Sequence, residues 1–455
     1  MADTGEVVDS TMYRTQIVPY DNDYRGGTGD VSNIIYVNDC KPDGCLIMPG
    51  AADNAITDTS VIASSISMLS AFDQTQETWD LALDCVREVF APYDVVITTT
   101  DPGSTAHHEA ILAGIGTEFG LDDPLILGVA PLTCAGAIDN AISFSFANAM
   151  PPGDWLRMCW TVAQESAHAY GLDHVFSCGD PMTYIPGCGV KYFRNKDLIC
   201  GDFGEQPCFC GGTQQNSHRR LTTLFGEGTL PDPPTLSIVH PMDGETVPDT
   251  FVALAEAQDP RQIDRMEVYV NGWLYETIPG NGFFAADDPY IFVPPANLAD
   301  GVLEIEFIAY NDLELSTSQT ITVTKGAPCS SAASCEEGQE CNEGACYWPT
   351  PTGQLGDSCV RPMDCESLLC PRSEEAEAVQ ICSQYCAVDS SNSGCPAAYD
   401  CLPLRDTPEQ GVCWPAPEVS EGCSASGQGG LSTGALALVL LLMGLGWRRR
   451  QAHLD

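Results

Sequence analysis

Residues 164–174 are Gln-Glu-Ser-Ala-His-Ala-Tyr-Gly-Leu-Asp-His, and this stretch decides how the first part of the chain is interpreted. Positions 164 and 168 are four residues apart, so in a helix both side chains project from one face toward one point. Gly171 lets the backbone leave the helix with a positive φ, which returns His174 to the same point. Glu165 lies alongside them. The spacing therefore predicts a helix and a sharp turn that bring the side chains of Gln164, His168 and His174 to one point.

A second motif follows in Asp180-Pro181-Met182-Thr183-Tyr184, where Met182 stands eight residues past His174. Together the two motifs resemble the metzincin zinc peptidases, whose His-Glu-x-x-His-x-x-Gly-x-x-His signature is matched at four of its five fixed positions. Met182 resembles the Met-turn of that family. Tyr184 resembles the tyrosine that astacins and serralysins add as a further zinc ligand. The resemblance covers residues 30–228.

The resemblance implies a zinc metalloendopeptidase. Zinc would be held by Gln164, His168, His174 and Tyr184, and it would polarise the scissile carbonyl and lower the pKa of its water toward about 7. Glu165 would be the general base that takes the proton of this zinc-activated water and passes it to the leaving amine. Tyr184 would also donate a hydrogen bond to the tetrahedral oxyanion.

One ligand departs from the family pattern, because Gln164 stands where the family has its first histidine. An amide oxygen is a neutral and weaker zinc ligand than imidazole. Three interpretations follow. Either all four groups hold zinc and the enzyme works, or His168 and His174 hold a metal weakly with little catalysis. In the third, the domain binds no metal and is a binding module.

Two smaller candidates lie outside this motif. His107-His108-Glu109 offers a replacement ligand if its loop folds over the cleft, but a solvated helix start after Pro102-Gly103-Ser104 is the favoured interpretation. Asp173 stands next to His174 and is either an orienting group for its ring or a surface carboxylate.

Hydrophobic periodicity gives the first domain an α/β (α+β) pattern. It predicts strands at 34–38, 95–99, 125–130 and 142–146, with helices at 78–90 and 154–170. We therefore expect a polar N-terminal segment at 1–29 and a metzincin-like catalytic domain at 30–228. Residues 230–234 (LPDPP) form a stiff linker. Residues 235–325 carry alternating strands and an Asn271-Gly272 turn, typical of an immunoglobulin-like β-sandwich.

The cysteines fall into two even blocks, ten between Cys40 and Cys210 and twelve between Cys329 and Cys413, with Cys423 left over. Such blocks predict disulfide frameworks in an oxidising compartment and a disulfide-rich module at 326–416. Acidic residues number 63 against 19 basic ones, for a net charge of −44. A surface of this charge repels phosphate backbones, so no nucleic-acid partner is expected.

Residues 421–450 form the tail. Cys423 precedes a small polar spacer, an apolar run at 434–447 and an arginine cluster at 448–450. This order resembles the C-terminal sorting tag of myxobacterial surface proteins, which implies a short hydrophobic helix in the membrane and a sorting protease that acts near Cys423 and removes the helix. A retained membrane anchor is the alternative.

The sequence as a whole predicts an exported, surface-sorted zinc metalloendopeptidase that acts on a protein or peptide substrate. Processing of the tail could release it from the cell surface. The alternative is a catalytically weak or inactive surface binding or adhesion protein built on the same domain, because Gln164 replaces the first histidine. Two measurements distinguish the two interpretations: the metal content of the protein, and its proteolytic activity compared with that of a Glu165→Ala control.

Overall fold

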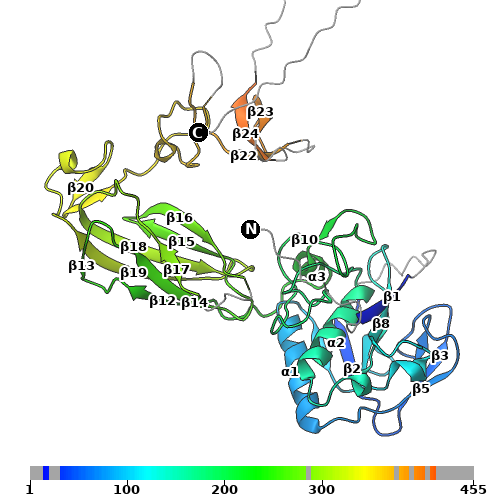
Figure 1. Cartoon of the computed structure of the whole chain (residues 1–455). Helices are drawn as coiled ribbons and strands as arrows, with labels where there is room; N and C mark the ends of the chain where they lie inside the picture. The colour runs from blue at the N-terminus through cyan, green and yellow to red at the C-terminus, as the bar shows by residue number, and fades with distance from the viewer. Residues whose placement is uncertain are drawn as a thin grey trace, which may run out of the picture. The chain divides into compact units, whose positions relative to one another are not determined.

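The protein has two compact units, residues 1–328 and 329–455. The computed structural model describes residues 14–19, 31–282, 288–372, 379–388, 394–404 and 410–416. Within these ranges the chain is a mostly-β multidomain protein with few helices and a disulfide-rich C-terminal region (Figure 1). No helix among the described residues has both the length and the apolar character needed to cross a bilayer.

A six-stranded mixed sheet organises the first domain. Strands β2, β6, β7 and β9 run parallel, β8 runs antiparallel to β9, and β1 runs parallel to β8. The order across the sheet is β1 (Arg14–Pro19), β8 (Ile126–Leu132), β9 (Ile142–Ser145), β7 (His108–Leu112), β2 (Ile34–Asn38) and β6 (Val96–Thr98). All residues of β7, β8 and β9 are buried, as expected for central strands covered on both faces.

Helices α1 (Gln76–Phe90) and α2 (Trp155–Ala169) lie side by side (Figure 1). The Cys85–Cys159 disulfide joins them. The side chains of Thr75 and Asp154 cap the two N-termini by accepting from backbone amides of the first turn. From Met158 onward α2 is buried at every position except Trp160. The helix predicted for 154–170 is thus confirmed, and it runs through the core of the domain.

The remaining elements of this domain are short. They are β3 (Cys45–Pro49), β4 (Thr59–Ser60), β5 (Ser67–Leu69), β10 (Leu198–Ile199), β11 (Gln214–Gln215), α3 (Ser217–Phe225) and the 3₁₀ turns Gly116–Phe119 and Ala147–Ala149.

One local prediction is wrong. A solvated helix start was expected around His107-His108-Glu109, but the chain there enters β7, between β2 and β9. His108 is buried and its Nε2 lies 2.9 Å from the Ser143 hydroxyl, so it is no replacement ligand. Backbone pairing on both sides overrides the local turn signal.

Residues 235–325 form the predicted two-sheet β-sandwich. One sheet contains β12 (Thr235–His240), β14 (Ala253–Gln258) and β17 (Tyr290–Phe292). The other contains β13 (Thr246–Val247), β19 (Ser316–Lys325), β18 (Gly301–Tyr310), β15 (Arg265–Val270) and β16 (Trp273–Pro279). Both inner faces contribute to one core. Asn271 and Gly272 have φ of 50° and 75° at the β15–β16 turn, as that turn chemistry requires.

A buried ion-pair cluster fastens the sandwich to the first domain. The Arg261 guanidinium donates to both carboxylate oxygens of Asp312 and to the Phe193 carbonyl, each at 2.8 Å. The Asn195 backbone amide donates to Asp312 at 2.9 Å, and Lys196 pairs with Asp264. The sandwich therefore belongs to one compact unit with the first domain, rather than hanging from the 230–234 linker alone.

The disulfide frameworks are confirmed. Five bridges lie in the first domain and six in the second unit, and they pair all 22 cysteines between Cys40 and Cys413. The second unit contains β20 (Glu340–Asn342), β21 (Ala345–Tyr347), β22 (Tyr385–Ala387), β23 (Tyr399–Pro403), β24 (Gln410–Pro415) and two 3₁₀ turns, Ala332–Ser334 and Pro362–Asp364. The predicted sorting tag at 421–450, with Cys423, lies outside the described residues.

Candidate metal centre

His168 and His174 face each other at the end of α2. Their Nε2 atoms are 3.0 Å apart, and the side chains are buried, with 0% and 4% of their surface exposed. The turn that brings them together has two characteristic bonds, from the Gly171 amide to the His168 carbonyl and from the Leu172 amide to the Ala167 carbonyl. Gly171 has φ of 83°, as predicted.

Each ring is already fixed at its other nitrogen. His168 Nδ1 lies 2.7 Å from the Leu172 carbonyl oxygen, and His174 Nδ1 lies 2.6 Å from an Asp202 carboxylate oxygen. When both Nδ1–H groups donate, the two Nε2 lone pairs point at each other across 3.0 Å. Such an arrangement needs a cation or a shared proton between the rings. The two histidines therefore fit a metal ion as the donor pair that the sequence predicts.

Burial keeps the His168 ring in the form that binds metals. It lowers the pKa of His168 well below its usual range, and the neighbouring His174 lowers it further. Neutral imidazole is the ligand form of histidine.

Glu165 is completely buried beside the edge of the sheet. A Cβ placed on Gly128 of β8 would lie 2.7 Å from its Oε1, so only glycine leaves room for the carboxylate there. Neither carboxylate oxygen has a hydrogen-bond partner of normal geometry among the described residues. Burial raises the pKa of Glu165 well above its usual range, and the nearby Thr15 hydroxyl offsets part of this rise. A cation next to it would bring the pKa down toward the range that a general base needs.

Gln164 lies one turn before His168 on α2 and is buried, with 4% of its surface exposed. Its Nε2 has no hydrogen-bond partner in the described part of the chain. A buried amide without a partner is costly.

Met182 and Tyr184 lie in the loop that closes under the histidines. Met182 is fully buried, and its carbonyl accepts from the Val175 amide at 2.9 Å, which ties the loop to the residue after His174. The Tyr184 ring centroid is 4.3 Å from that of His174. Burial raises the pKa of the Tyr184 hydroxyl, so it stays a neutral donor. The Cys178–Cys188 disulfide brackets the loop.

Asp202 is a site residue that sequence reasoning missed. Its carboxylate accepts from His174 Nδ1, and this hydrogen bond lowers the pKa of Asp202. Asp173, the sequence candidate for this role, instead accepts from the His174 backbone amide at 2.8 Å. Asp202 stands inside the short loop closed by Cys200–Cys208, and no motif in the sequence connects it to His174.

Thr15 is the second residue that was missed. It lies in β1, 159 residues before His174, and its hydroxyl is 3.4 Å from His174 Nε2 and 3.1 Å from the Tyr184 hydroxyl. The Tyr184 hydroxyl also donates to the Thr15 carbonyl oxygen at 2.7 Å. The segment 1–29 was expected to be only a polar leader to the domain. Its strand 14–19 is part of the sheet and touches the site.

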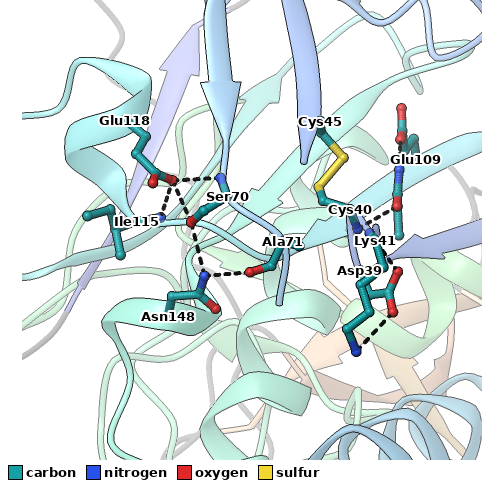
Figure 2. The surroundings of a disulfide bond; sticks show 11 residues. Asp39, Cys40, Lys41, Cys45, Ser70, Ala71, Glu109, Ile115, Glu118 and Asn148 are labelled. Atoms are coloured by element: carbon teal, nitrogen blue, oxygen red, sulfur yellow. Dashed lines mark hydrogen bonds and ion pairs between the residues drawn. A yellow bond between two sulfur atoms is a disulfide. The ribbon is translucent and has the colours of Figure 1, made fainter. Parts of the chain in front are cut away.

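The buried carboxylate of Glu109 belongs to a different place. Its Oε1 accepts from the Asn38 side-chain amide at 2.7 Å, near the Cys40–Cys45 disulfide (Figure 2). The cysteines form further clusters of three within the second unit that have ligand-like separations, but every one of them is in a disulfide. Within the described residues, this leaves the histidine pair as the metal-binding candidate.

Comparison with known proteins adds little. No protein-family model matches the chain, and no curated protein matches it. Fibronectin(III)-like modules of Clostridium thermocellum CbhA are 19% identical over 22% of this chain and 50% of theirs, with a TM-score of 0.17. The endo-β-1,4-mannanase from Thermotoga petrophila is 20% identical over 24% of this chain and 23% of its own, with a TM-score of 0.18. Wild-type OgpA from Akkermansia muciniphila is 11% identical over 70% of this chain and 98% of its own, with a TM-score of 0.17. Likenesses at these TM-scores carry no argument about function.

Proposed function

We propose that the chain is an exported zinc metalloendopeptidase of metzincin type. One observation carries the proposal: two buried imidazoles present their Nε2 atoms to each other at 3.0 Å. The fully buried Glu165 follows Gln164 on the same helix and lies against Gly128 of β8. His168 and His174 would hold the zinc, with Gln164 and Tyr184 completing the donor set. The zinc would supply Lewis acidity and make water a nucleophile near neutral pH.

The protein groups around this point have distinct tasks. Glu165 would hold the proton that the attacking water loses and return it to the leaving amine, since its carboxylate is otherwise unpartnered. Tyr184 already donates to a backbone carbonyl oxygen, that of Thr15, and would make the same bond to the carbonyl of a substrate peptide. Asp202 would hold His174 in the tautomer that leaves Nε2 free.

Zinc stoichiometry and proteolysis test the proposal on the full chain. We expect the wild-type protein to bind one zinc per chain and cleave casein, and Glu165→Gln to keep the zinc while losing at least about a hundredfold in rate. Glu109→Gln is the matched control, because it also neutralises a deeply buried carboxyl group but lies away from the histidines. Absence of zinc from the wild-type protein would leave the binding-module alternative, which Gln164 in place of a histidine favours.

Surface sorting is the second part of the proposal. Eleven disulfides support an oxidising compartment. Cys423 would be the processing point of the tag, where a sorting protease releases the tail from the membrane. Mass spectrometry of the C-terminus, comparing wild type with Cys423→Ser, tests it, because only the variant should retain residues beyond 423.

A further inference from the structure

The loop that carries Tyr184 is irregular. Residues 183–188 belong to no helix or strand, and Pro186 and Gly187 are exposed. The loop nevertheless holds the Tyr184 ring centroid 4.3 Å from that of His174. Because such a loop has no ladder of backbone hydrogen bonds, other groups must hold its carbonyls if the side chain is to keep one position.

Lys191 holds two of these carbonyls. Its Nζ donates to the Ile185 carbonyl at 2.8 Å and, over a longer 3.4 Å, to the Thr183 carbonyl, so it binds the residues on either side of Tyr184. The Thr183 carbonyl belongs to the peptide plane that precedes Tyr184. Holding that plane restricts the direction in which the Tyr184 side chain leaves the backbone.

The amino group of Lys191 is buried at this place. The residue has 2% of its surface exposed, and Nζ lies 4.4 Å from the centroid of the Trp160 ring. Among the described residues its hydrogen bonds go to the two carbonyls alone. Burial lowers the pKa of Lys191 to about 7, while nearby Asp180 opposes the fall. Amine and ammonium both carry N–H donors, so these bonds do not depend on the protonation state.

The residues that follow Lys191 bind the same loop from below. The Tyr192 amide donates to the Gly179 carbonyl at 3.0 Å, and the Arg194 amide donates to the Asp180 carboxylate at 2.9 Å. That carboxylate also accepts from the Met182 amide at 3.0 Å. Residues 192 and 194 are thus fastened to the turn that leads into Tyr184.

The alternate residues of the same segment bind the β-sandwich. The Phe193 carbonyl accepts from Arg261 at 2.8 Å, and the Asn195 amide donates to Asp312 at 2.9 Å. Alternation of backbone groups between two sides is the pattern of an extended segment. Residues 191–195 therefore connect the sandwich on one side with the Tyr184 loop on the other.

We infer that the β-sandwich is part of the catalytic unit. Through residues 191–195 it supports the loop of Met182 and Tyr184, and Lys191 is the positioning residue that directs Tyr184 toward the histidines. The inference rests on the proposed function for the task of Tyr184, whereas the support of the loop requires no metal.

Fluorine NMR of 3-fluorotyrosine placed at position 184 tests the support in metal-free, full-length protein. Lys191→Met should shift and broaden this resonance, because methionine fills similar space beside Trp160 but donates no hydrogen bond. Lys325→Met is the matched control, since Lys325 is also buried and donates to a backbone carbonyl, that of Leu298. It should leave the resonance unchanged. No change in Lys191→Met, or the same change in both variants, would overturn the inference.

A second pair of variants tests the contribution of the sandwich with Lys191 intact. Arg261→Met removes the donor to the Phe193 carbonyl and should shift the resonance at position 184. Arg265→Met removes an arginine of the same sandwich that pairs with Glu314 instead, and should not shift it. An unchanged resonance in Arg261→Met would show that the loop does not depend on the sandwich.

A double-mutant cycle on peptide hydrolysis tests whether Lys191 acts through Tyr184. Lys191→Met should lower kcat by about tenfold or more with KM nearly unchanged, and should have no further effect in Tyr184→Phe. Losses that multiply in the double variant would show that Lys191 does not act through Tyr184. If the wild-type protein neither binds zinc nor hydrolyses peptides, but its resonance still responds to Lys191→Met, the peptidase proposal fails and the support of the loop stands.

Discussion

At the scale of single residues, the site depends on two imidazoles whose free nitrogens are forced together. The Nδ1–H groups donate to the Leu172 carbonyl and the Asp202 carboxylate and so fix the tautomers, and burial keeps His168 neutral. A positive charge between the two rings removes the cost of leaving two lone pairs facing each other at 3.0 Å. In the proposed site, Gln164 would be the weak ligand of this charge.

Replacing that weak ligand tests its role. Gln164→His should tighten zinc binding by about ten- to a hundredfold, because imidazole is a better zinc ligand than an amide oxygen. Isothermal titration with zinc measures the gain. The wild-type protein should have a measurable proteolytic rate, and the rate of Gln164→His should be higher. If activity were present in Gln164→His and absent from the natural sequence, the natural protein would not be a peptidase.

Asp202 gives a prediction about orientation. Asp202→Asn should weaken zinc binding by about tenfold or more, because the amide no longer enforces the His174 tautomer with Nδ1 protonated. Asp173→Asn is the matched control, since Asp173 contacts the backbone amide of His174 and not its ring. The His174 imidazole proton resonances would report the tautomer independently of activity. Equal zinc affinities for the two variants would show that Asp202 does not position the ring.

At the scale of elements, the helix–turn unit and the sheet edge create the site together. Helix α2 is buried along most of its length, so its polar residues 164, 165 and 168 lie inside the domain. The turn at Gly171 then reverses the chain within hydrogen-bonding distance of Arg220, whose side chain donates to the Tyr170 and Gly136 carbonyls. The bond to the Tyr170 carbonyl satisfies an acceptor at the buried end of α2, and the bond to the Gly136 carbonyl ties the neighbouring loop to it.

Two glycines with nearly the same φ allow the cost of backbone strain to be separated from the cost of a steric clash. Gly171 and Gly153 have φ of 83° and 81°, but a Cβ at Gly171 would lie 2.8 Å from the Gly136 carbonyl oxygen, whereas Gly153 is in open space. Gly153→Ala should cost about 1 kcal/mol of stability and Gly171→Ala at least about 2 kcal/mol. Only Gly171→Ala should also weaken zinc binding. Denaturant unfolding and zinc titration measure both, and equal costs would contradict the predicted clash.

Strand β7 supplies a pH-dependent prediction. Burial raises the pKa of Glu109 to about 8, and Asp58 and Asp101 add to the rise against the Asn38 hydrogen bond. From the ordinary pKa of 4.5 up to about 8, the unfolded chain loses this proton first, so the folded state loses stability as pH rises. Glu109→Gln removes this pH-dependent loss of stability. The free energy of unfolding of the variant should equal that of wild type near pH 4 and exceed it by roughly 4 kcal/mol above pH 8. A difference that is constant with pH in unfolding experiments would contradict the prediction.

At the scale of the whole molecule, covalent bridges and one buried ion pair hold the architecture. In the first domain, Cys85–Cys159 joins α1 to α2, Cys178–Cys188 brackets the loop of Met182 and Tyr184, and Cys200–Cys208 closes the loop that carries Asp202. The cluster of Arg261 and Asp312 then joins the sandwich to that domain. Arg261 and Asp312 both belong to the sandwich, and the first domain completes the cluster with the Phe193 carbonyl and the Asn195 backbone amide.

Removing one side of this pair should be costly. Arg261→Met leaves Asp312 buried with a missing partner and should destabilise the first unit by about 3 kcal/mol. Arg265→Met breaks the more exposed pair with Glu314 on the same sandwich and should cost under about 1 kcal/mol. Scanning calorimetry of the full chain measures both. Hydrogen exchange at Phe193–Lys196 should rise only in Arg261→Met, and similar behaviour of the two variants would show that the junction does not depend on this pair.

Local patterns determined much of this protein. The apolar periodicity and the Asp154 cap predicted α2, and the Asn271-Gly272 pair predicted the β15–β16 hairpin. The cysteine blocks predicted the two disulfide frameworks. The Gln164–His174 spacing also put the two histidines at one point, since residues four apart and a positive-φ turn are short-range geometry. These features depend on neighbours in sequence, which the sequence displays directly.

Only the tertiary structure decided which distant groups complete the site. Asp202 reaches His174 from a disulfide loop, Thr15 reaches it by pairing of β1 with β8, and His108 is removed from it by burial in β7. Each of these contacts depends on strand order and loop path across many residues, and edge pairing depends on backbone groups that every residue carries. Side-chain patterns record burial and local turns, but they do not record which backbone edge a strand will join.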